Sequence, residues 1–279
     1  MRILLAGKNS FIGRSIIPMI IQDGYDVLAL SREECNFTDT EQVMSVFKKY
    51  GKFDCCINLT ANGGRKFIKK DTLQDFHDNV KINENLINCK EFYSKMLIFG
   101  SGASFGQEND INLVKEGDYK TIPTNYYGLS KYVNSKRAKN ESKISELVLF
   151  NCFGPLEKRR FINYAINYYI NKKQIEIWND IYLDFFYIDD LFSIIKYVIK
   201  NNDTKELNCC YKKKYKMSEA VEIINNLSNY KVSVIINSKT GNNYCGNGDK
   251  LNSIKEIKLK GLKRGIIETY NKIKKENNG

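Results

Sequence analysis

The chain has 279 residues, 42% of them hydrophobic, which excludes a disordered protein and allows a large core. No apolar run approaches the ~20 residues of a membrane span, and the opening MRILLAG is too short for a signal peptide, so we expect a cytoplasmic protein. The formal net charge of +12 is compatible with nucleic acid, a membrane surface or an acidic small molecule as partner, and composition alone does not choose among them.

The cysteine and histidine content excludes several classes of site. The eight cysteines include two adjacent pairs and no C-x-x-C motif, so neither a zinc site nor a redox pair is indicated. We expect reduced, mostly buried thiols. His77 is the single histidine, which excludes a histidine pair, and we expect it on a helix surface. The sequence therefore predicts no metal site.

In the first half of the chain, short apolar runs alternate with helical segments. We expect strands at RILLAG, YDVLALSR, FDCCINLTA and KMLIFGSGASFG, and helices at FIGRSIIPMIIQDG, at EQVMSVFKKYG and over residues 71–94. Strands that alternate with helices predict a doubly wound parallel sheet covered on both faces, which is a Rossmann-type α/β fold.

The pattern changes near Pro155. Before it, a helix YYGLSKYVNSKRAKNES precedes a strand ELVLFNCFG; after it, RRFINYAINYYINKK predicts a helix, QIEIW a strand and YIDDLFSIIKYVIK a helix that starts with acidic residues. We expect a Rossmann domain over residues 1–158, with residues 184–200 packing back onto it. Residues 159–279 are expected to form a smaller C-terminal α/β lobe.

The stretch GKNSFIG lies between the first strand and the first helix. Gly7 and Gly13 stand six residues apart, and Ser10 lies midway, where a central glycine is expected. A glycine turn lets the backbone approach a phosphate, whose charge the helix N-terminus favours. This favours a dinucleotide site over a plain strand-to-helix turn. The expected contacts are Gly7, Asn9, Ser10, Phe11, Ile12 and Gly13.

The second strand ends in LALSREECNFTD. Where an NAD-binding protein offers a carboxylate to the ribose 2′-hydroxyl, this chain has Ser31 and Arg32. A guanidinium suits a 2′-phosphate, so we predict NADP(H). Glu33 or Glu34 remains an alternative ligand of the ribose.

The stretch NYYGLSKY contains two tyrosines ahead of a lysine. Only Tyr127 stands four residues before Lys131, and on a helix these two positions share a face, unlike Tyr126. An ammonium near the Tyr127 hydroxyl would favour the phenolate and make it an acid or base near neutral pH. An ordinary helix with this pair on one side has the same spacing.

Taken together, these segments resemble the extended short-chain dehydrogenase/reductase superfamily of NAD-dependent epimerases and dehydratases. Within it they resemble GDP-L-fucose synthase-like and dTDP-4-dehydrorhamnose reductase-like nucleotide-sugar reductases. The resemblance covers roughly residues 1 to 200 and rests on the order of GKNSFIG, LIFGSGASFG, NYYGLSKY, NCFGP and DFFYIDDL.

The resemblance implies an enzyme with NADP(H) bound by residues 1–158 and a nucleotide-diphosphate sugar bound by residues 159–279. It implies no nucleic-acid or membrane partner. We also expect a homodimer, through the helices over residues 71–94 and 126–142, on fold analogy alone.

The resemblance also implies the catalytic residues. Tyr127 would be the acid/base, and Lys131 would lower its pKa and bind the nicotinamide ribose. Ser101, at the end of the strand KMLIFGS, would polarise the substrate carbonyl. Ser104 is the alternative serine.

The resemblance implies further binding residues. Leu59, Thr60 and Ala61 would line the cofactor, and Asn151 would lie where the strand meets the nicotinamide and the sugar. Asn79 resembles the asparagine of the helix next to the active site. These families commonly have an arginine at the position of Leu183 that binds the diphosphate, and here Arg159 or Arg160 could replace it.

The expected reaction is C4 reduction of an NDP-4-keto-6-deoxy sugar, with GDP as the expected nucleotide, for surface polysaccharide synthesis. Fucose synthase-like proteins use a cysteine and a histidine to epimerise at C3 and C5, and here Ala103 and Arg160 stand at those places. We therefore expect no epimerisation. The alternatives are a bifunctional epimerase/reductase, an NAD-dependent 4-epimerase, a less favoured dehydratase, and a non-catalytic RNA-binding or regulatory protein.

Overall fold

The computed structural model describes residues 1–64 and 70–278, which form two compact units. Each unit is assembled from separate segments of the chain. The assignment of cofactor binding to residues 1–158 and of sugar-nucleotide binding to residues 159–279 stays a prediction. Unit 1 comprises Met1–Glu108, Glu116–Val148 and Lys196–Leu207, and unit 2 comprises Asn109–Lys115, Leu149–Ile195 and Asn208–Gly279.

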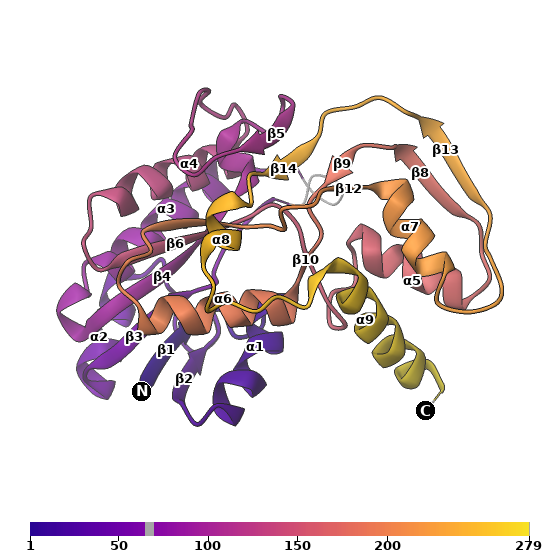
Figure 1. The fold of residues 1–279 in the computed structure, drawn as a ribbon. Helices are drawn as coiled ribbons and strands as arrows, with labels where there is room; N and C mark the ends of the chain where they lie inside the picture. Colours follow the sequence, from indigo (N-terminus) through magenta and orange to yellow (C-terminus); the bar gives the residue numbers. More distant parts are fainter. Residues whose placement is uncertain (65–69, 279) are drawn as a thin grey trace. The chain divides into compact units, whose positions relative to one another are not determined.

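A six-stranded sheet with the order β11-β6-β4-β3-β1-β2 forms the centre of unit 1 (Figure 1). Strand β1 (Arg2–Ala6) pairs in parallel with β2 (Asp26–Leu30) on one side and with β3 (Phe53–Asn58) on the other. β3 pairs in parallel with β4 (Tyr93–Ser101). The remaining strands are β6 (Ile144–Leu149) and β11 (Glu206–Cys209). This arrangement confirms the predicted Rossmann-type fold, in which nucleotides bind at the carboxyl ends of the strands, where the strand order reverses.

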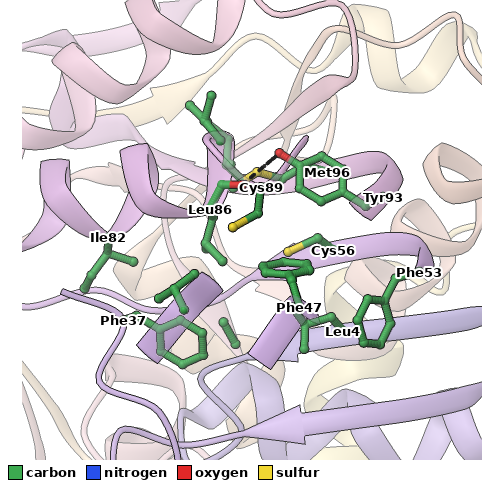
Figure 2. Close-up of a cluster of buried hydrophobic side chains, with 14 of the residues drawn as sticks. Leu4, Phe37, Phe47, Phe53, Cys56, Ile82, Leu86, Cys89, Tyr93 and Met96 are labelled. Carbon is green, nitrogen blue, oxygen red and sulfur yellow. Dashed lines mark hydrogen bonds between the residues drawn. The ribbon is translucent and has the colours of Figure 1, made fainter. Parts of the chain in front are cut away.

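The core of unit 1 forms because β1 and β3 are almost continuously apolar and the helices that cover them each have an apolar face. Figure 2 shows Leu4, Phe47, Cys56, Leu86 and Met96 packed together, all with no exposed surface. The helices of this unit are α1 (Phe11–Gln22), α2 (Thr40–Tyr50), α3 (Leu73–Ile87) and α4 (Tyr126–Lys139).

The helix expected over residues 71–94 is too long and is corrected here. Helix α3 ends at Ile87 and is followed by the short 3₁₀ helix η1 (Lys90–Phe92). Tyr93 already belongs to β4, where it is aligned with Phe53 of β3. Sheet pairing therefore overrides the helical pattern at the end of this segment.

Unit 2 consists of short strands and helices. Its strands pair as β10 with β7, as β12-β9-β14-β5, and as β13 with β8. The strands are β5 (Ile111–Val114), β7 (Cys152–Phe153), β8 (Ile175–Asn179), β9 (Tyr182–Leu183), β10 (Phe186–Tyr187), β12 (Tyr215–Lys216), β13 (Val234–Ser238) and β14 (Tyr244–Gly246). The helices are α5 (Phe161–Ile170), α6 (Ile188–Lys200), whose last turn belongs to unit 1, α7 (Met217–Asn225), α8 (Asp249–Ser253) and α9 (Gly261–Asn278).

Two expectations about the chain as a whole can be compared with the structure. All eight cysteines are buried free thiols, as predicted. In the part of the chain that the structure describes, no helix combines the length and the apolar character needed to cross a bilayer.

Candidate active site

The turn that follows Ser101 packs closely against the helix that carries Tyr127. β4 ends at Ser101, and the short 3₁₀ helix η2 (Gly102–Phe105) comes next. A Cβ atom on Gly128 of α4 would lie 2.7 Å from the Ala103 carbonyl oxygen. Because only glycine permits this approach, the start of α4 can lie directly on η2, and the predicted catalytic serine and tyrosine come from two elements in contact.

Lys131 connects α4 to the end of β4. Its Nζ atom donates a hydrogen bond of 2.7 Å to the Phe99 carbonyl oxygen, two residues before Ser101, and the lysine side chain is buried. The same Nζ atom lies 5.7 Å from the centroid of the Tyr127 ring. The structure thus brings the predicted tyrosine–lysine pair to the carboxyl end of β4, where Ser101 lies.

The two candidate serines differ in the use of their hydroxyl groups. Ser104 is fully buried, and its hydroxyl donates to the Ser101 carbonyl oxygen at 2.6 Å, which holds the turn together. The Ser101 Oγ accepts a bond of 3.2 Å from the Ala103 amide. The structure therefore gives the Ser104 hydroxyl a part in the turn itself, and Ser101 as the catalytic serine stays a prediction.

Asn79 of α3 holds the loop after β3 against α4. Its side chain accepts from the Asn62 amide at 2.7 Å and donates to the Asn62 carbonyl at 2.9 Å and to Ser130 Oγ at 3.0 Å. A Cβ atom on Gly64 would lie 2.8 Å from the Tyr127 ring. The backbone of this loop therefore borders the Tyr127 ring.

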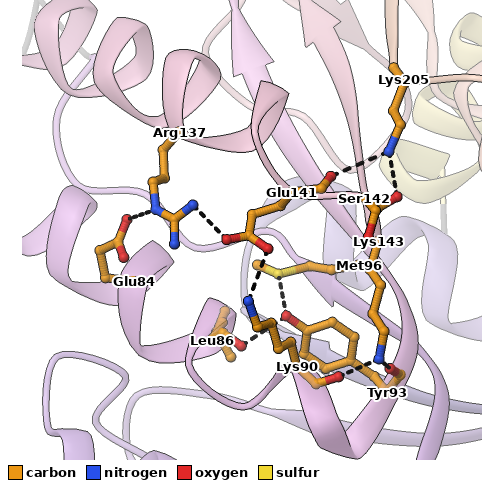
Figure 3. A network of polar contacts seen from close by, with 10 residues as sticks. All are labelled: Glu84, Leu86, Lys90, Tyr93, Met96, Arg137, Glu141, Ser142, Lys143 and Lys205. Carbon is orange, nitrogen blue, oxygen red and sulfur yellow. Dashed lines mark hydrogen bonds and ion pairs between the residues drawn. The ribbon is translucent and has the colours of Figure 1, made fainter.

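An ion-pair network fixes α3 beside α4 (Figure 3). Arg137 of α4 donates to Glu84 of α3 at 3.0 Å and to Glu141 at 2.6 Å. The hydrogen bond from Arg137 holds the pKa of Glu141 below its ordinary value. Partly exposed pairs of this kind contribute modestly to stability, but they set the register of the two helices that carry Asn79 and Tyr127.

The glycine loop after β1 fits the phosphates of a dinucleotide. Gly7 has φ +98°, and a Cβ atom there would lie 3.0 Å from the Leu59 carbonyl carbon, so this turn needs glycine. Ser10, expected as a glycine substitute, caps α1 by accepting from the Gly13 amide at 3.0 Å. No described residue accepts from the amides of Phe11 or Ile12, which are therefore available to phosphate oxygens at a helix N-terminus.

The ends of β1 and β3 lie side by side. The Leu59 amide donates to the Ala6 carbonyl at 2.9 Å. The Thr60 amide and the Thr60 hydroxyl both donate to Asn58 Oδ1, at 3.1 and 2.6 Å. Ala61 is exposed after them. The predicted cofactor-lining residues after β3 thus follow the strand next to the glycine loop.

At the end of β2 the structure shows both a carboxylate and cations. Glu34 accepts from the Ser31 amide at 2.8 Å and from the Ser31 hydroxyl at 2.9 Å, and Lys8 donates to it at 2.5 Å. The hydrogen bond from Lys8, together with those from Ser31, lowers the pKa of Glu34 to about 2. Arg32 is exposed and donates to Asn62 Oδ1 at 2.6 Å. Of the two candidate carboxylates, Glu34 rather than Glu33 is therefore the one held at the end of β2 beside Ser31.

The predicted substrate residues lie in unit 2. Asn151 is buried, and its Oδ1 accepts a bond of 2.9 Å from Arg160 Nη1. The backbone amides of Arg159 and Arg160 donate to Glu157 at 2.7 and 2.5 Å, just before α5. Both arginines are exposed, and the structure brings Arg160, but not Arg159, into contact with Asn151.

Several buried charged groups were not anticipated from the sequence, among them Asp184 and Glu146. Asp184 of unit 2 pairs with Lys214 at 2.7 Å, and burial raises the pKa of Asp184 to about 6. Glu146 of unit 1 is 2% exposed within β6. A carboxylate at the start of the largely apolar run ELVLFNCFG, within the predicted strand, was the signal that could have identified Glu146 as unusual.

Comparison with known families agrees with this geometry. Residues 3–210 match the model of the NAD dependent epimerase/dehydratase family. The chain belongs to this family. Membership confirms the predicted superfamily and identifies the chain as an enzyme that uses a nicotinamide dinucleotide.

Individual relatives are more distant. GDP-L-colitose synthase of Yersinia pseudotuberculosis is 22% identical, with 83% of each chain covered. Among solved structures, GDP-mannoheptose C4 reductase from Campylobacter jejuni with NADP bound has a TM-score of 0.84 at 19% identity and covers 98% of both chains. A GDP-L-fucose synthetase from Naegleria fowleri bound to NADP has a TM-score of 0.81 at 16% identity, over 99% of this chain and 94% of that one. At these identities the structural likeness shows the fold.

Proposed function

We propose that this enzyme is an NADPH-dependent C4 reductase of an NDP-4-keto-6-deoxy sugar. The observation that carries the proposal is the convergence of Ser101, Tyr127 and Lys131 at the carboxyl end of β4, in a chain of this family. A non-catalytic RNA-binding or regulatory protein would have no need for a buried lysine held two residues from the catalytic serine.

The three side chains divide the chemistry of ketone reduction. The bound nicotinamide supplies the hydride. Negative charge then develops on the C4 oxygen, and the Ser101 hydroxyl stabilises it by donating a hydrogen bond. Tyr127 gives its proton to that oxygen, and the Lys131 ammonium stabilises the resulting phenolate. One hydride and one proton therefore convert the ketone into an alcohol.

The preference for NADPH rests on the cations at the end of β2. Arg32 and Lys8 both lie around the Ser31–Glu34 turn, and a guanidinium can bind the dianionic 2′-phosphate with two parallel hydrogen bonds. The Glu34 carboxylate opposes this, but its charge is already paired with Lys8. We therefore assign the 2′-phosphate to Arg32.

The sugar nucleotide is assigned to the segment around Asn151 and Arg160. Arg160 presents a planar cation beside a buried amide, an arrangement that suits a diphosphate and an adjacent sugar hydroxyl. GDP is the proposed nucleotide because the relatives named above include a GDP-L-colitose synthase and a GDP-mannoheptose C4 reductase. The product would serve surface polysaccharide synthesis.

The same residues argue against epimerisation at C3 and C5. Such epimerisation needs two further acid/base groups. Ala103 has no proton to exchange, Arg160 stays protonated, and His77 is exposed on the face of α3 opposite the buried Asn79. Burial raises the pKa of Cys152 to about 12, so this neighbour of Asn151 is not a suitable base either.

The proposal is tested with a panel of GDP-, dTDP- and UDP-linked 4-keto-6-deoxy sugars. NADPH absorbance should fall with one nucleotide series, and the product should carry the hydride at C4. In D₂O without NADPH, no deuterium should enter C3 or C5 above the blank. Enzyme-dependent exchange at either carbon identifies the bifunctional alternative. Interconversion of NDP-sugars that differ only at a C4 hydroxyl, supplied in place of the ketones and without net cofactor consumption, identifies the 4-epimerase.

The homodimer stays a prediction, as it rests on fold analogy with α3 and α4 as the contact helices. Light scattering at micromolar concentration decides between dimer and monomer.

A further inference from the structure

Glu146 lies on β6, the strand next to β4, and contacts β4 near its carboxyl end. A Cβ atom on Gly100 would lie 2.2 Å from Glu146 Oε1, so the carboxyl group rests against the backbone at Gly100. This glycine stands between Phe99, whose carbonyl binds Lys131, and Ser101. A side chain at position 100 would displace the carboxyl group, which glycine leaves beside the proposed catalytic residues.

Glu146 and Lys131 line the same small polar pocket. Asn83 and Asn134 also line it, and in each of them one buried side-chain atom, Asn83 Nδ2 and Asn134 Oδ1, has no hydrogen-bond partner among the described residues. A polar cavity of about the size of a water molecule, with several donors and acceptors, has room for one ordered water. A water there would lie between the Lys131 and Glu146 side chains that line the pocket.

Ser135 provides a second connection. Its Oγ lies 2.5 Å from Glu146 Oε1 and 2.9 Å from the Lys131 carbonyl oxygen. A hydroxyl has one hydrogen and can fully donate to only one of these oxygens. If Glu146 is ionised, the Ser135 hydroxyl donates to the carboxylate. If Glu146 is protonated, the carboxyl group donates to Ser135 Oγ, and the Ser135 hydroxyl then donates to the Lys131 carbonyl. The protonation of Glu146 therefore changes the hydrogen bonds on the Lys131 backbone.

Three charged residues on two elements act on the Glu146 carboxyl group. Lys131 and Lys139 of α4 favour its ionised form, and Glu206 of β11 opposes it. Glu206 accepts from the Tyr119 hydroxyl at 2.9 Å and pairs with Lys139 at 3.5 Å. Burial outweighs the cations and raises the pKa of Glu146 to about 8, so the carboxyl group is mostly neutral at pH 7.

We propose that Glu146 is a positioning residue whose carboxyl group, through the shared pocket and Ser135, controls the protonation of the Lys131–Tyr127 pair. The effect on turnover rests on the proposed function, whereas the coupling between Glu146 and Lys131 does not. When Glu146 ionises, its charge favours the protonated forms of Lys131 and Tyr127. Reduction needs the proton on Tyr127, so the carboxylate should extend activity to higher pH.

The coupling can be measured without substrate. In protein labelled with ¹³C at the glutamate carboxyl carbon, the Glu146 resonance is assigned by its loss in Glu146→Gln. Lys131→Met should move the titration midpoint of Glu146 upward by about one pH unit, because the substitution removes a nearby cation that favours the carboxylate. Lys136→Met, on the exposed side of the same helix and outside the pocket, should leave the midpoint unchanged. An equal midpoint in wild type and Lys131→Met would overturn the proposal.

The effect on turnover is measured with the pH profile of kcat. Glu146→Gln keeps the shape and hydrogen-bonding capacity of the side chain but cannot ionise, so the basic limb should shift down by about one pH unit. Glu91→Gln makes the same chemical change at an exposed position of η1, outside the pocket, and should leave the profile unchanged. A merely structural role would lower activity equally at all pH values, and that result contradicts the proposal. If no sugar is turned over, the proposed function fails, and the carboxyl titration still decides the coupling.

Discussion

The catalytic end of unit 1 and the Asn151–Arg160 segment of unit 2 are built differently. Lys131 is buried and anchored to β4, and Asn79 and Gly128 fix the elements around it. Arg160 is exposed, and within residues 1–64 and 70–278 its side chain makes one hydrogen bond, to Asn151. Reacting groups need such pre-organisation, whereas a group that binds a diphosphate can order when the ligand arrives. Substitutions should therefore cost far more in the first region than in the second.

The largest effect is expected for Tyr127→Phe. It removes the proton donor and should lower kcat by about 10⁴-fold, while NADPH binding, followed by fluorescence titration, stays within about twofold. Tyr126→Phe is the matched control, since this neighbouring tyrosine is 39% exposed and has no lysine four residues later. Substantial turnover by Tyr127→Phe would remove the assignment of Tyr127.

A large effect on stability is expected from Glu146. Its pKa in the folded protein, about 8, exceeds the value of 4.5 expected when it is exposed. Between these values the folded state binds more protons than the unfolded state, so the free energy of unfolding falls as pH rises, by about 1.4 kcal/mol per pH unit at most. The loss is complete above pH 8 and absent below pH 4.5.

Glu146→Gln should remove this slope. Urea denaturation at pH 5, 6.5 and 8.5 should show wild type losing stability relative to the variant across the series. Glu141→Gln should keep the wild-type slope, because the pKa of Glu141 is lowered and this group is therefore ionised in the folded and the unfolded state across the series. Parallel curves for wild type and Glu146→Gln would show that the carboxyl group does not titrate in this window.

Ser101→Ala should cost about 10²-fold in kcat, the usual loss for one donor to a developing oxyanion. Ser104→Ala instead removes the bond that holds the turn, so it should lower the unfolding temperature more than Ser101→Ala does. Both variants are compared at a temperature where each is fully folded. If Ser104→Ala then lowers kcat more than Ser101→Ala, Ser104 rather than Ser101 is the catalytic serine.

The sequence was informative where local chemistry is repeated in a fixed order. Glycine at the end of β1, serine at the end of β4 and the Tyr127–Lys131 spacing all follow from the local demands of strand ends and a helix face. These features predicted the sheet and the candidate residues of unit 1.

The remaining features depend on contacts between distant segments. Nothing near Glu146 in the chain indicates that its carboxyl group contacts Gly100. Likewise, nothing near Gly128 indicates that a side chain there would collide with the Ala103 carbonyl. The end of α3 likewise depends on Tyr93 pairing with β3. Such contacts are set by tertiary packing, which a one-dimensional pattern does not contain.

Arg160→Ala should raise the KM for the sugar nucleotide by about tenfold with little change in kcat, because an exposed cation contributes about one charge-assisted hydrogen bond to binding. Arg159→Ala is the control, since Arg159 has the same charge and exposure but does not contact Asn151. Equal effects of the two substitutions would indicate general attraction rather than a specific contact.

The smallest effect is expected at the end of β2, which resembles the Arg160 region in its exposed charges. Arg32→Ala should lower the ratio of kcat/KM for NADPH to that for NADH by up to about tenfold, because only NADPH carries the 2′-phosphate. Glu34→Gln should raise this ratio, as it removes the carboxylate that occupies the Ser31 amide and hydroxyl. Glu33→Gln, an exposed neighbour, should change neither. A wild type that prefers NADH, together with no response to Arg32→Ala, would make Glu34 the ribose ligand and Lys8 its counter-ion.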